Sequence, residues 1–299
     1  MRWWSKMQLL SFLTAKNDEL IIEKTLKRLS ESSDGIIAVD DGSTDRTYDI
    51  IRSFDKVVKI IRNEPNGEWN IFRDCEKVMD EVGRIKPEWL MYIDSDDLLD
   101  KRFAERKKEL LDDKSVGRYH FKEITLWGSI QKYRDDKPEW YSRDSGRTPY
   151  LVRWSPDVYI NDPYAGSVKQ NLLRKARKNQ LVGYLKRKYP FEKLEHHSPK
   201  GSLMKYMKES FWPTDFMDYT NILLLGYEGK EVELDLVKMH YHFADMSYAW
   251  KKHMNYALQS AIRHNRTPGE IPNIVNWATE KLNEDGLVLK DVNPEWGAL

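Results

Sequence analysis

Two short apolar runs in this chain each lead into a cluster of aspartates, and this pattern constrains the fold more than any other feature. Residues 36–39 run into an acidic cluster at 40–45, and residues 89–93 run into another at 94–97. A short β-branched or aromatic run that ends in polar residues is typical of a buried strand. In open α/β sheets, ligands bind beyond the carboxyl ends of the strands. The pattern therefore predicts a ligand site where two strands end.

Strand-like and helix-like segments alternate through the first part of the chain. The strand patterns cover residues 7–13, 36–39, 57–61, 89–93 and 119–127. Apolar residues at helical spacing cover 18–29, 70–82 and 102–111, and a helix capped by Ser43 or Thr44 precedes the third strand. This order implies an α/β fold of the Rossmann type, a mostly parallel sheet flanked by helices on both faces.

The pattern changes after residue 127. We expect residues 1–127 to form one half of a domain, and residues 128–245, which include a strand at 232–242, to complete it as a mixed second half. Helical segments at 248–264 and 268–282 would make a C-terminal helical extension from residue 246 onward. The basic run at 168–188 is interpreted as a solvated helix face in preference to a phosphate- or lipid-binding patch.

Composition narrows the classes of partner and compartment. The 299 residues include 49 Lys and Arg against 48 Asp and Glu, so no global charge points to a nucleic acid partner. The single cysteine, Cys75, excludes an internal disulfide and fits a reducing compartment. No apolar run approaches the ~20 residues of a membrane helix, and no targeting segment stands out. We therefore expect a cytoplasmic protein. The sequence does not decide whether it also contacts a membrane surface, nor what its oligomeric state is.

Asp94 and Asp96 have the spacing of a metal site. In extended backbone, residues i and i+2 point to the same face, so both carboxylates can address one cation at the strand end. Mg²⁺ or Mn²⁺ held by one or two carboxylates keeps positions open for substrate phosphates. The alternative is an acidic turn that caps the helix starting near residue 101, through Asp97 or Asp100.

Asp40 and Asp41 end a neighbouring strand of the same predicted sheet. A carboxylate there could accept hydrogen bonds from a nucleobase or from ribose hydroxyls. The first strand ends beside it in the polar sequence 14–19. The alternative is again helix capping, by Ser43, Thr44 or Asp45.

Residues 7–111 resemble the donor-binding half of an inverting family 2 glycosyltransferase of the GT-A fold. The resemblance is carried by Thr14 to Glu19, Val39 to Asp45, Gly67 with Arg73-Asp74, and Ile93 to Asp97. It implies that Asp41 contacts the nucleobase, that Asp94 lies near the ribose or the metal, and that Asp96 is the principal metal ligand. The expected donor-binding residues are Thr14, Ala15, Asn17, Asp41, Arg73, Asp94 and Ser95. The family usually has Arg-Asn where this chain has Arg73-Asp74, which leaves the role of Asp74 open.

The resemblance also implies a general base in the second half of the chain. Glu195 is the first candidate, with His196 or His197 assisting, and the competing carboxylates are Asp157, Asp162, Asp215 and Asp218. A carboxylate in this role would deprotonate the acceptor hydroxyl. His240 and His242 would point to one face of a strand and complete the metal shell or contact the diphosphate; the alternative is a buried structural histidine.

The predicted function is transfer of a hexose from a nucleoside-diphosphate sugar, UDP-linked by default, to an acceptor hydroxyl with inversion and with Mn²⁺ or Mg²⁺ as cofactor. The acceptor could be a glycan, a lipid-linked glycan or a protein. A phosphatase is the first alternative, but the adjacent aspartates 40 and 41 would point to opposite faces. A sugar-phosphate nucleotidyltransferase would need a glycine-rich loop, and residues 14–19 contain no glycine. A non-catalytic carbohydrate-binding protein is the third alternative.

Overall fold

The computed structural model describes residues 7–65, 71–136, 150–161, 223–252 and 287–297. The chain divides into two compact units, residues 1–159 with 224–299, and residues 160–223. The site described below lies in the first unit. The domain boundaries expected at residues 127 and 245 stay a prediction. Among the described residues, no helix has the length and apolar character needed to cross a membrane.

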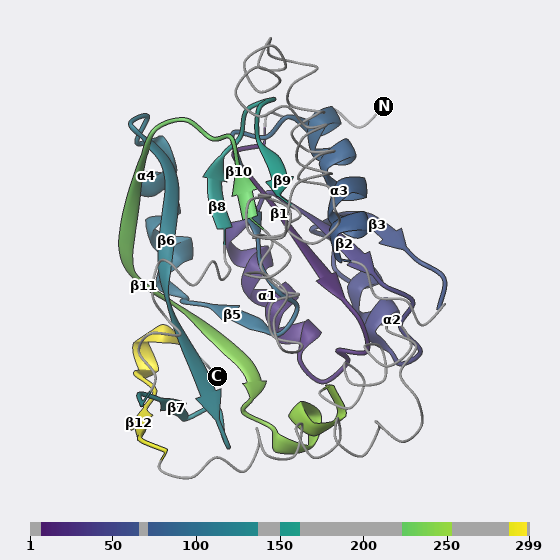
Figure 1. Ribbon diagram of the computed structural model, residues 1–299, viewed down its shortest axis with the longest axis vertical. Coiled ribbons are helices and arrows are strands. Elements are labelled where there is room, and N and C mark those ends of the chain that lie inside the picture. The colour runs from purple at the N-terminus through teal and green to yellow at the C-terminus, as the bar shows by residue number, and fades with distance from the viewer. Residues whose placement is uncertain (1–6, 66–70, 137–149, 162–222, 253–286, 298–299) are drawn as a thin grey trace, which may run out of the picture. The chain divides into compact units, whose positions relative to one another are not determined.

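A parallel set of four strands forms one half of the main sheet (Figure 1). The strands lie in the order β3-β2-β1-β4, with β1 in contact with both β2 and β4. Their bounds are β1 Leu9–Ala15, β2 Gly35–Asp40, β3 Val57–Arg62 and β4 Trp89–Tyr92. The connecting helices are α1 Ile22–Ser32, α2 Thr47–Arg52 and α3 Ile71–Ile85. This arrangement confirms the predicted α/β class and brings the ends of β2, β1 and β4 to one edge.

Helices cover both faces of this parallel set. Leu13 of β1 and Met91 of β4 share a buried apolar cluster with residues of α1 and of α4 (Arg102–Asp112). Their neighbours Phe12 and Tyr92 point to the opposite face, because strand side chains alternate, and their rings lie 4.9 Å apart. Helix α3 contacts β1 and β2, and its Cys75 lies close enough to Tyr92 to influence the pKa of that phenol. Strands β1, β2 and β4 are consequently buried on both sides, whereas β3 at the edge is partly exposed.

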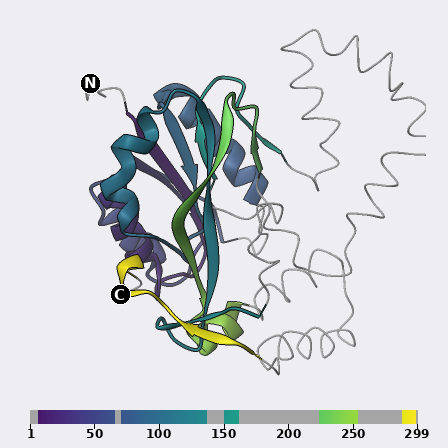
Figure 2. The same ribbon diagram turned by 90° about the vertical axis from the view of Figure 1, so that its left-hand side faces the viewer.

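The other half of the sheet is mixed. Strand β8 pairs antiparallel with β4, β6 pairs antiparallel with β8, and the long β11 runs parallel to β6. The short β5 pairs antiparallel with β11, and β7 and β12 extend the sheet beyond β6. Figure 2 shows β6 and β11 side by side along most of their length. The bounds are β5 Asp97–Leu99, β6 Val116–Trp127, β7 Lys132–Arg134, β8 Tyr150–Arg153, β11 Lys230–Phe243 and β12 Leu289–Asp291.

The remaining described elements are small. Strands β9 (Tyr159–Asn161) and β10 (Leu223–Leu225) form a two-stranded sheet, and Pro294–Trp296 forms a 3₁₀ turn. Residues 246–252 are helical, which agrees with the helix expected from residue 248 as far as the structure describes it. Asp245 caps this helix, since its Oδ1 accepts the backbone N–H groups of Ser247 and Tyr248. The predicted segments 168–188 and 268–282 lie outside the described residues.

Two local predictions are wrong. The first helix begins at Ile22 and not at residue 18, because the Asp18 carbonyl closes a turn with the N–H groups of Ile21 and Ile22. The helix after β2 is not capped by Ser43 or Thr44; it begins at Thr47, whose N–H donates to Oδ1 of Asp45 at 2.9 Å. Residues 95–96 form a turn, as one alternative expected, and Asp97 then starts the strand β5, which was not predicted.

Candidate active site

Asp41 lies just beyond β2, within a buried set of hydrogen bonds and charges. Its Oδ1 accepts hydrogen bonds from Nδ2 of Asn63 and Nη2 of Arg73, each at 2.8 Å. Its Oδ2 lies 3.3 Å from Nζ of Lys16, in the loop after β1. Burial raises the pKa of Asp41, and the nearby charge of Asp74 adds to the rise. The end of β2 therefore presents a carboxylate held between two cations.

Asp74, in the first turn of α3, is the second carboxylate of this cluster. Its Oδ1 accepts hydrogen bonds from Nδ2 of Asn63 at 2.7 Å and from Nε of Arg73 at 2.8 Å. Nζ of Lys77 donates to Oδ1 of the same asparagine at 2.6 Å. The Arg-Asp sequence thus fixes the guanidinium of Arg73 at its Nε side and directs Nη2 to Asp41.

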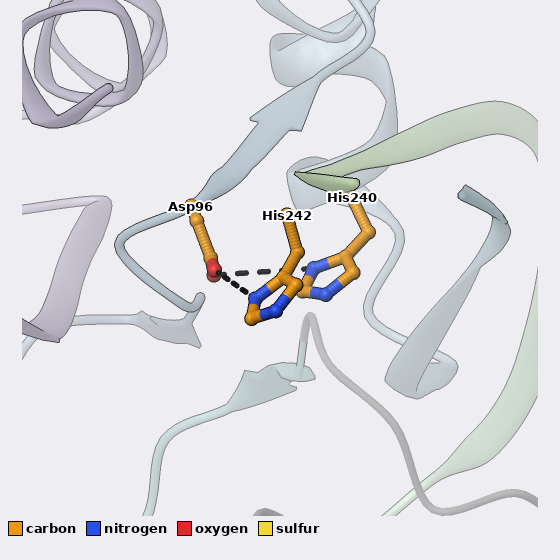
Figure 3. A group of neighbouring side chains, drawn as sticks. All are labelled: Asp96, His240 and His242. Atoms are coloured by element: carbon orange, nitrogen blue, oxygen red, sulfur yellow. Dashed lines mark hydrogen bonds and ion pairs between the residues drawn. The ribbon is translucent and has the colours of Figure 1, made fainter. Parts of the chain in front are cut away.

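Asp96, His240 and His242 form a second cluster, beyond the end of β4. One possible ligand atom from each residue lies within 4.8 Å of those of the other two. Nδ1 of His242 lies 3.3 Å from Oδ2 of Asp96, and Nδ1 of His240 lies 3.9 Å from Oδ1. Figure 3 shows the two imidazole rings side by side, facing the Asp96 carboxylate. The rings are nearly parallel, with centroids 5.5 Å apart and 11° between their planes.

Strand pairing brings these three residues together. His240 and His242 are two residues apart in β11, so their side chains point to the same face. The antiparallel register of β5 and β11 sets His240 opposite Asp97. The backbone N–H of Tyr241 donates to the Asp96 carbonyl at 2.8 Å. Residues about 145 positions apart in the chain are consequently held by backbone hydrogen bonds.

The three groups of this cluster have shifted pKa values. Burial alone would raise the pKa of Asp96, but the charge of Lys252 and the two imidazoles hold it well below its usual value. Burial lowers the pKa of His242. Burial would also lower the pKa of His240, but the carboxylates of Asp96 and Asp97 raise it. The shifts at Asp96 and His242 favour the deprotonated forms that bind metals, whereas the shift at His240 favours its protonated form.

Asp94, which was expected near the ribose or the metal, forms a hydrogen bond within its own strand end. Its Oδ1 accepts a hydrogen bond from Oη of Tyr92 at 2.6 Å. Burial and the neighbouring charge of Asp97 raise its pKa to about 6. Asp94 is absent from the group of possible metal ligands found among the described residues. The geometry therefore brings Asp96, and not Asp94, to the two histidines.

The loop after β1 connects the two clusters. Asp18 is fully buried, and its Oδ1 lies 2.8 Å from Nζ of Lys252 and accepts a hydrogen bond from Oη of Tyr248. Its Oδ2 accepts a hydrogen bond from Oγ of Ser95 and one from the backbone N–H of Lys16 at 3.1 Å. Since the Lys16 side chain reaches the Asp41 cluster, one loop contacts both strand ends.

Asn17 connects this same loop to the loop after β2 by hydrogen bonds. Its backbone is left-handed, with φ of 56°. Its N–H donates to Oγ of Ser43 at 3.0 Å, and its side-chain oxygen accepts the N–H of Thr44 at 2.8 Å. Thr14 and Ala15 are buried at the end of β1, where the Ala15 carbonyl accepts the N–H of Asp41. Both loops are thus held in a fixed relation at the sheet edge.

Asp97 lies beneath the second cluster, in a buried group of charges. Its Oδ1 lies 2.8 Å from Nδ1 of His240, and its Oδ2 lies 3.0 Å from Nζ of Lys238. The same ammonium group lies 3.0 Å from Oε2 of Glu123 on β6. Burial would lower the pKa of Lys238, but the carboxylates of Asp97 and Glu123 raise it. The lysine is therefore charged at all ordinary pH values.

The residues of the second cluster fit a divalent metal ion. One carboxylate and two imidazoles provide three donor atoms and leave coordination positions for a ligand's oxygens. The 3.3 Å between Oδ2 of Asp96 and Nδ1 of His242 suits adjacent ligands on one ion. Imidazole nitrogen is a poor ligand for Mg²⁺, which prefers oxygen, so the donor set favours Mn²⁺ among the two ions expected.

The predicted site residues thus fall into three groups. Arg73 lies with Asp41, Ser95 lies with Asp18, and Asp96 lies with both histidines, as described above. The capping alternative holds for Asp100, whose Oδ1 accepts the N–H of Arg102 at the start of α4. Asp157, a candidate base, lies exposed after β8. The other candidate bases and their assisting histidines lie outside the described residues: Asp162, Glu195, His196, His197, Asp215 and Asp218.

Sequence reasoning missed three polar residues of the site. Asn63 follows directly after β3, so the rule that polar residues gather at strand ends could have identified it. Asp18 was assigned to a helix start, although it follows the polar end of β1. Lys252 carries no local signal, because its contact with Asp96 joins residues 156 positions apart.

Residues 12–175, more than half of the chain, match the model described as Glycosyl transferase family 2. No curated protein matches the chain.

Comparison with solved structures gives weaker likenesses. The chain is 18% identical to Staphylococcus aureus TarS, with a TM-score of 0.38, and the match covers 49% of this chain and 28% of the TarS chain. It is 11% identical to residues 1–349 of TarS, with a TM-score of 0.41, and this match covers 93% of this chain and 73% of the TarS fragment. It is 13% identical to the mannosyltransferase PcManGT from Pyrobaculum calidifontis, with a TM-score of 0.38, and this match covers 93% of this chain and 70% of PcManGT.

The chain spans less than a third of the length of the first of these TarS chains. The family match begins within β1 and includes β2, β3 and β4 and the acidic residues that follow β2 and β4. The chain belongs to glycosyl transferase family 2.

Proposed function

We propose that this protein transfers a hexose from a nucleoside-diphosphate sugar to an acceptor hydroxyl, with inversion at the anomeric carbon. The observation that carries the proposal is the cluster of Asp96, His240 and His242. It lies in the same sheet edge as the Asp41 cluster, and the loop after β1 joins the two. One end of such a site can hold a diphosphate through a cation, and the other can hold a nucleoside.

The nucleoside end is assigned to the polar groups after β1 and β2. Asp41 would accept hydrogen bonds from the nucleobase, since carboxylates are acceptors of N–H groups. Its contacts with Arg73 and Asn63 hold the carboxylate in one orientation before a nucleotide arrives. Thr14, Ala15 and Asn17 would line the same end, and Asp94 and Ser95 would face the ribose. UDP is the default nucleotide.

The metal end is assigned to Asp96, His240 and His242, which would hold Mn²⁺ in preference to Mg²⁺. A divalent cation held by these residues would supply positive charge to neutralise a nucleoside diphosphate leaving group. The protein contributes three ligand atoms fixed by strand pairing and a carboxylate kept ionised by its cationic neighbours. Such ligands need little rearrangement when the donor binds.

The base is assigned to Glu195, assisted by His197. A carboxylate would take the proton of the acceptor hydroxyl as that oxygen attacks the anomeric carbon. Attack opposite the leaving nucleotide gives inversion. The acceptor is a glycan, a lipid-linked glycan or a protein, and we expect the reaction in the cytoplasm or at a membrane surface.

A thermal-shift screen tests the donor assignment. The native protein is heated with UDP, GDP and their common sugar conjugates, with and without Mn²⁺. A ligand that binds the folded state raises the melting temperature. We expect at least one nucleotide to raise it more with Mn²⁺ than without. If no nucleotide shifts the melting temperature under either condition, the proposed function is wrong.

Once a donor is known, product stereochemistry and one substitution test the chemistry. Proton NMR of the product should show the anomeric configuration opposite to that of the donor; retention would contradict inversion. Glu195→Gln should abolish transfer and leave nucleotide binding unchanged. Full activity in Glu195→Gln would disprove only the assignment of the base.

A further inference from the structure

The hydrogen bond between Asp97 and His240 determines what the imidazole can bind. Nδ1 of His240 lies 2.8 Å from Oδ1 of Asp97, whose side chain is completely buried. A carboxylate only accepts hydrogen bonds, so Nδ1 must carry the proton in this contact. The other nearby carboxylate oxygen, Oδ1 of Asp96, is 3.9 Å from Nδ1, which is too far for a hydrogen bond. In the neutral ring, Nε2 then carries the lone pair.

Lys238 fixes the carboxylate of Asp97 in this orientation. Its ammonium group lies 3.0 Å from Oδ2 of Asp97, and it is 2% exposed. The two carboxylate oxygens therefore have different partners, Oδ1 the imidazole and Oδ2 the lysine. Rotating the carboxylate would exchange these contacts but could not supply a donor to His240. The second contact of Lys238, with Glu123, holds the ammonium group in place.

The backbone gives this contact little freedom. His240 on β11 is the direct register partner of Asp97 on β5, and the two strands pair antiparallel over Asp97–Leu99. The N–H of Asp100, just after β5, donates to the Val237 carbonyl at 2.8 Å, which extends the pairing. The side chains of Asp97 and His240 consequently meet at a distance set by the sheet.

We propose that Asp97 is a positioning residue for the metal site: it keeps the proton of His240 on Nδ1 and so reserves Nε2 for the cation. The inference rests on the proposed function, because it gives His240 the role of metal ligand. Carboxylates that hold metal-binding histidines in this way fix both the tautomer and the ring orientation. Lys238 supports the carboxylate, and neither residue touches substrate.

Asp97→Asn tests the inference with almost no change of shape. The ammonium group of Lys238 is a donor, so it should attract the amide oxygen of the new asparagine and turn the amide NH₂ toward His240. An NH₂ group needs an acceptor at Nδ1. We therefore expect the proton of His240 to move to Nε2, where it competes with metal binding.

The tautomer is read directly from ¹⁵N NMR of the histidine rings. Spectra are recorded on metal-free protein at a pH where the ring is neutral, and His240→Gln assigns the signal. We expect Nδ1–H in the native protein and Nε2–H in Asp97→Asn. An Nε2–H tautomer in the native protein would overturn the inference without any variant, so the test stands even if Asp97→Asn fails to fold.

Mn²⁺ affinity, measured by calorimetry without nucleotide, supplies the second readout. Asp97→Asn should bind Mn²⁺ roughly 10- to 100-fold more weakly than the native protein. The matched control is Glu123→Gln, which makes the same change in the other partner of Lys238 and leaves the contact between Asp97 and His240 in place. We expect it to keep native affinity and the native tautomer.

If Asp97→Asn and Glu123→Gln lost Mn²⁺ affinity equally, Asp97 would act only through the buried charges, and this result would contradict the inference. Native Mn²⁺ affinity in Asp97→Asn would also contradict it. Both readouts are made without a nucleotide. A protein that shows the predicted tautomer and Mn²⁺ affinities but binds no nucleotide would therefore disprove the proposed function and leave the role of Asp97 intact.

Discussion

The ammonium group of Lys252 lies 3.3 Å from Oδ2 of Asp96, the oxygen that also faces His242. The same ammonium group lies 2.8 Å from Oδ1 of Asp18. Lys252 therefore joins the helix after β11 to the loop after β1, and it compensates the charge of Asp96. A divalent cation bound by Asp96 would lie close to this positive charge.

Replacing Lys252 should strengthen the binding of metal alone. Lys252→Met removes the competing positive charge from Asp96 while it keeps most of the side-chain volume. We expect Mn²⁺ affinity without nucleotide to rise roughly tenfold, or about 1.4 kcal/mol, measured by calorimetry. Lys251→Met removes the same charge from an exposed position next to it and should have no effect. A weaker affinity in Lys252→Met would show that the lysine supports the metal site.

Arg73→Lys should weaken nucleotide binding and leave metal binding unchanged. The guanidinium reaches Asp41 through Nη2 and Asp74 through Nε, each at 2.8 Å, and a single ammonium group cannot reproduce this fork. We expect nucleotide affinity to fall about tenfold, or about 1.4 kcal/mol, in a titration with Mn²⁺ present.

The control for Arg73 lies on the same helix. The side chain of Arg84 is 71% exposed and forms an ion pair with Glu81 one helical turn away. Because exposed ion pairs contribute little, Arg84→Lys should leave nucleotide affinity unchanged. If Arg73→Lys also lowered Mn²⁺ affinity without nucleotide, the separation of the site into two ends would be wrong.

Asp34→Asn should destabilise the fold at neutral pH and much less in acid. The Asp34 carboxylate accepts the N–H groups of Gln8 and Leu9 at 2.7 and 2.9 Å and contacts Lys107. Burial would raise its pKa, but the contact with Lys107 and the two N–H groups hold it below the usual 3.8. The stabilisation is therefore complete above pH 3.8 and is lost as the pH falls through the lower folded-state pKa.

Urea unfolding of the native protein and of Asp34→Asn at two pH values measures this effect. The carboxylate is 37% exposed, so solvent screens it, and we expect a loss of about 1 kcal/mol at neutral pH. The difference should shrink below pH 3.8. A difference that stays constant with pH would mean that the charge of Asp34 contributes nothing.

Replacing Gly42 by alanine should lower the stability of the fold, and replacing Gly83 by alanine should raise it. Gly42, next to Asp41, has φ of 69°, and a Cβ there would lie 2.7 Å from the backbone of Pro65. Gly42→Ala should therefore cost about 1–3 kcal/mol of stability. Gly83 lies in α3 with nothing within 4 Å of its Cβ position, so Gly83→Ala should gain up to about 1 kcal/mol. Thermal unfolding measures both, and a tolerated Gly42→Ala would contradict the described loop geometry.

The sequence predicted the parallel half of the sheet because its signals are local. Apolar runs, the spacing of helices and the acidic strand ends each lie within about ten residues, and they placed Asp41 and Asp96 at the edge of the sheet. Strand β5 was missed because three residues, Asp97–Leu99, are too short for an alternating pattern. What makes them a strand is their pairing with β11, more than 130 positions away.

The histidines were predicted to complete a metal shell or to contact the diphosphate, with a buried structural role as the alternative, and the structure brings His240 and His242 to Asp96. Their neighbours could not be predicted. Lys252 and Lys238 look like ordinary surface lysines in the sequence, and only the folded sheet reveals that each meets buried carboxylates. Asp94 accepts a hydrogen bond from Tyr92, a contact that the spacing argument did not predict.

The central claim is that Asp96 and the two histidines hold the cation through which this protein binds a nucleoside diphosphate. Calorimetry with UDP or GDP, in the presence of Mn²⁺ and in its absence, tests it most directly. We predict binding by the native protein that needs Mn²⁺, no such binding by Asp96→Ala, and native binding by Asp55→Ala, which changes an exposed aspartate. Nucleotide binding that persists in Asp96→Ala, or that is the same with and without Mn²⁺, would contradict the claim.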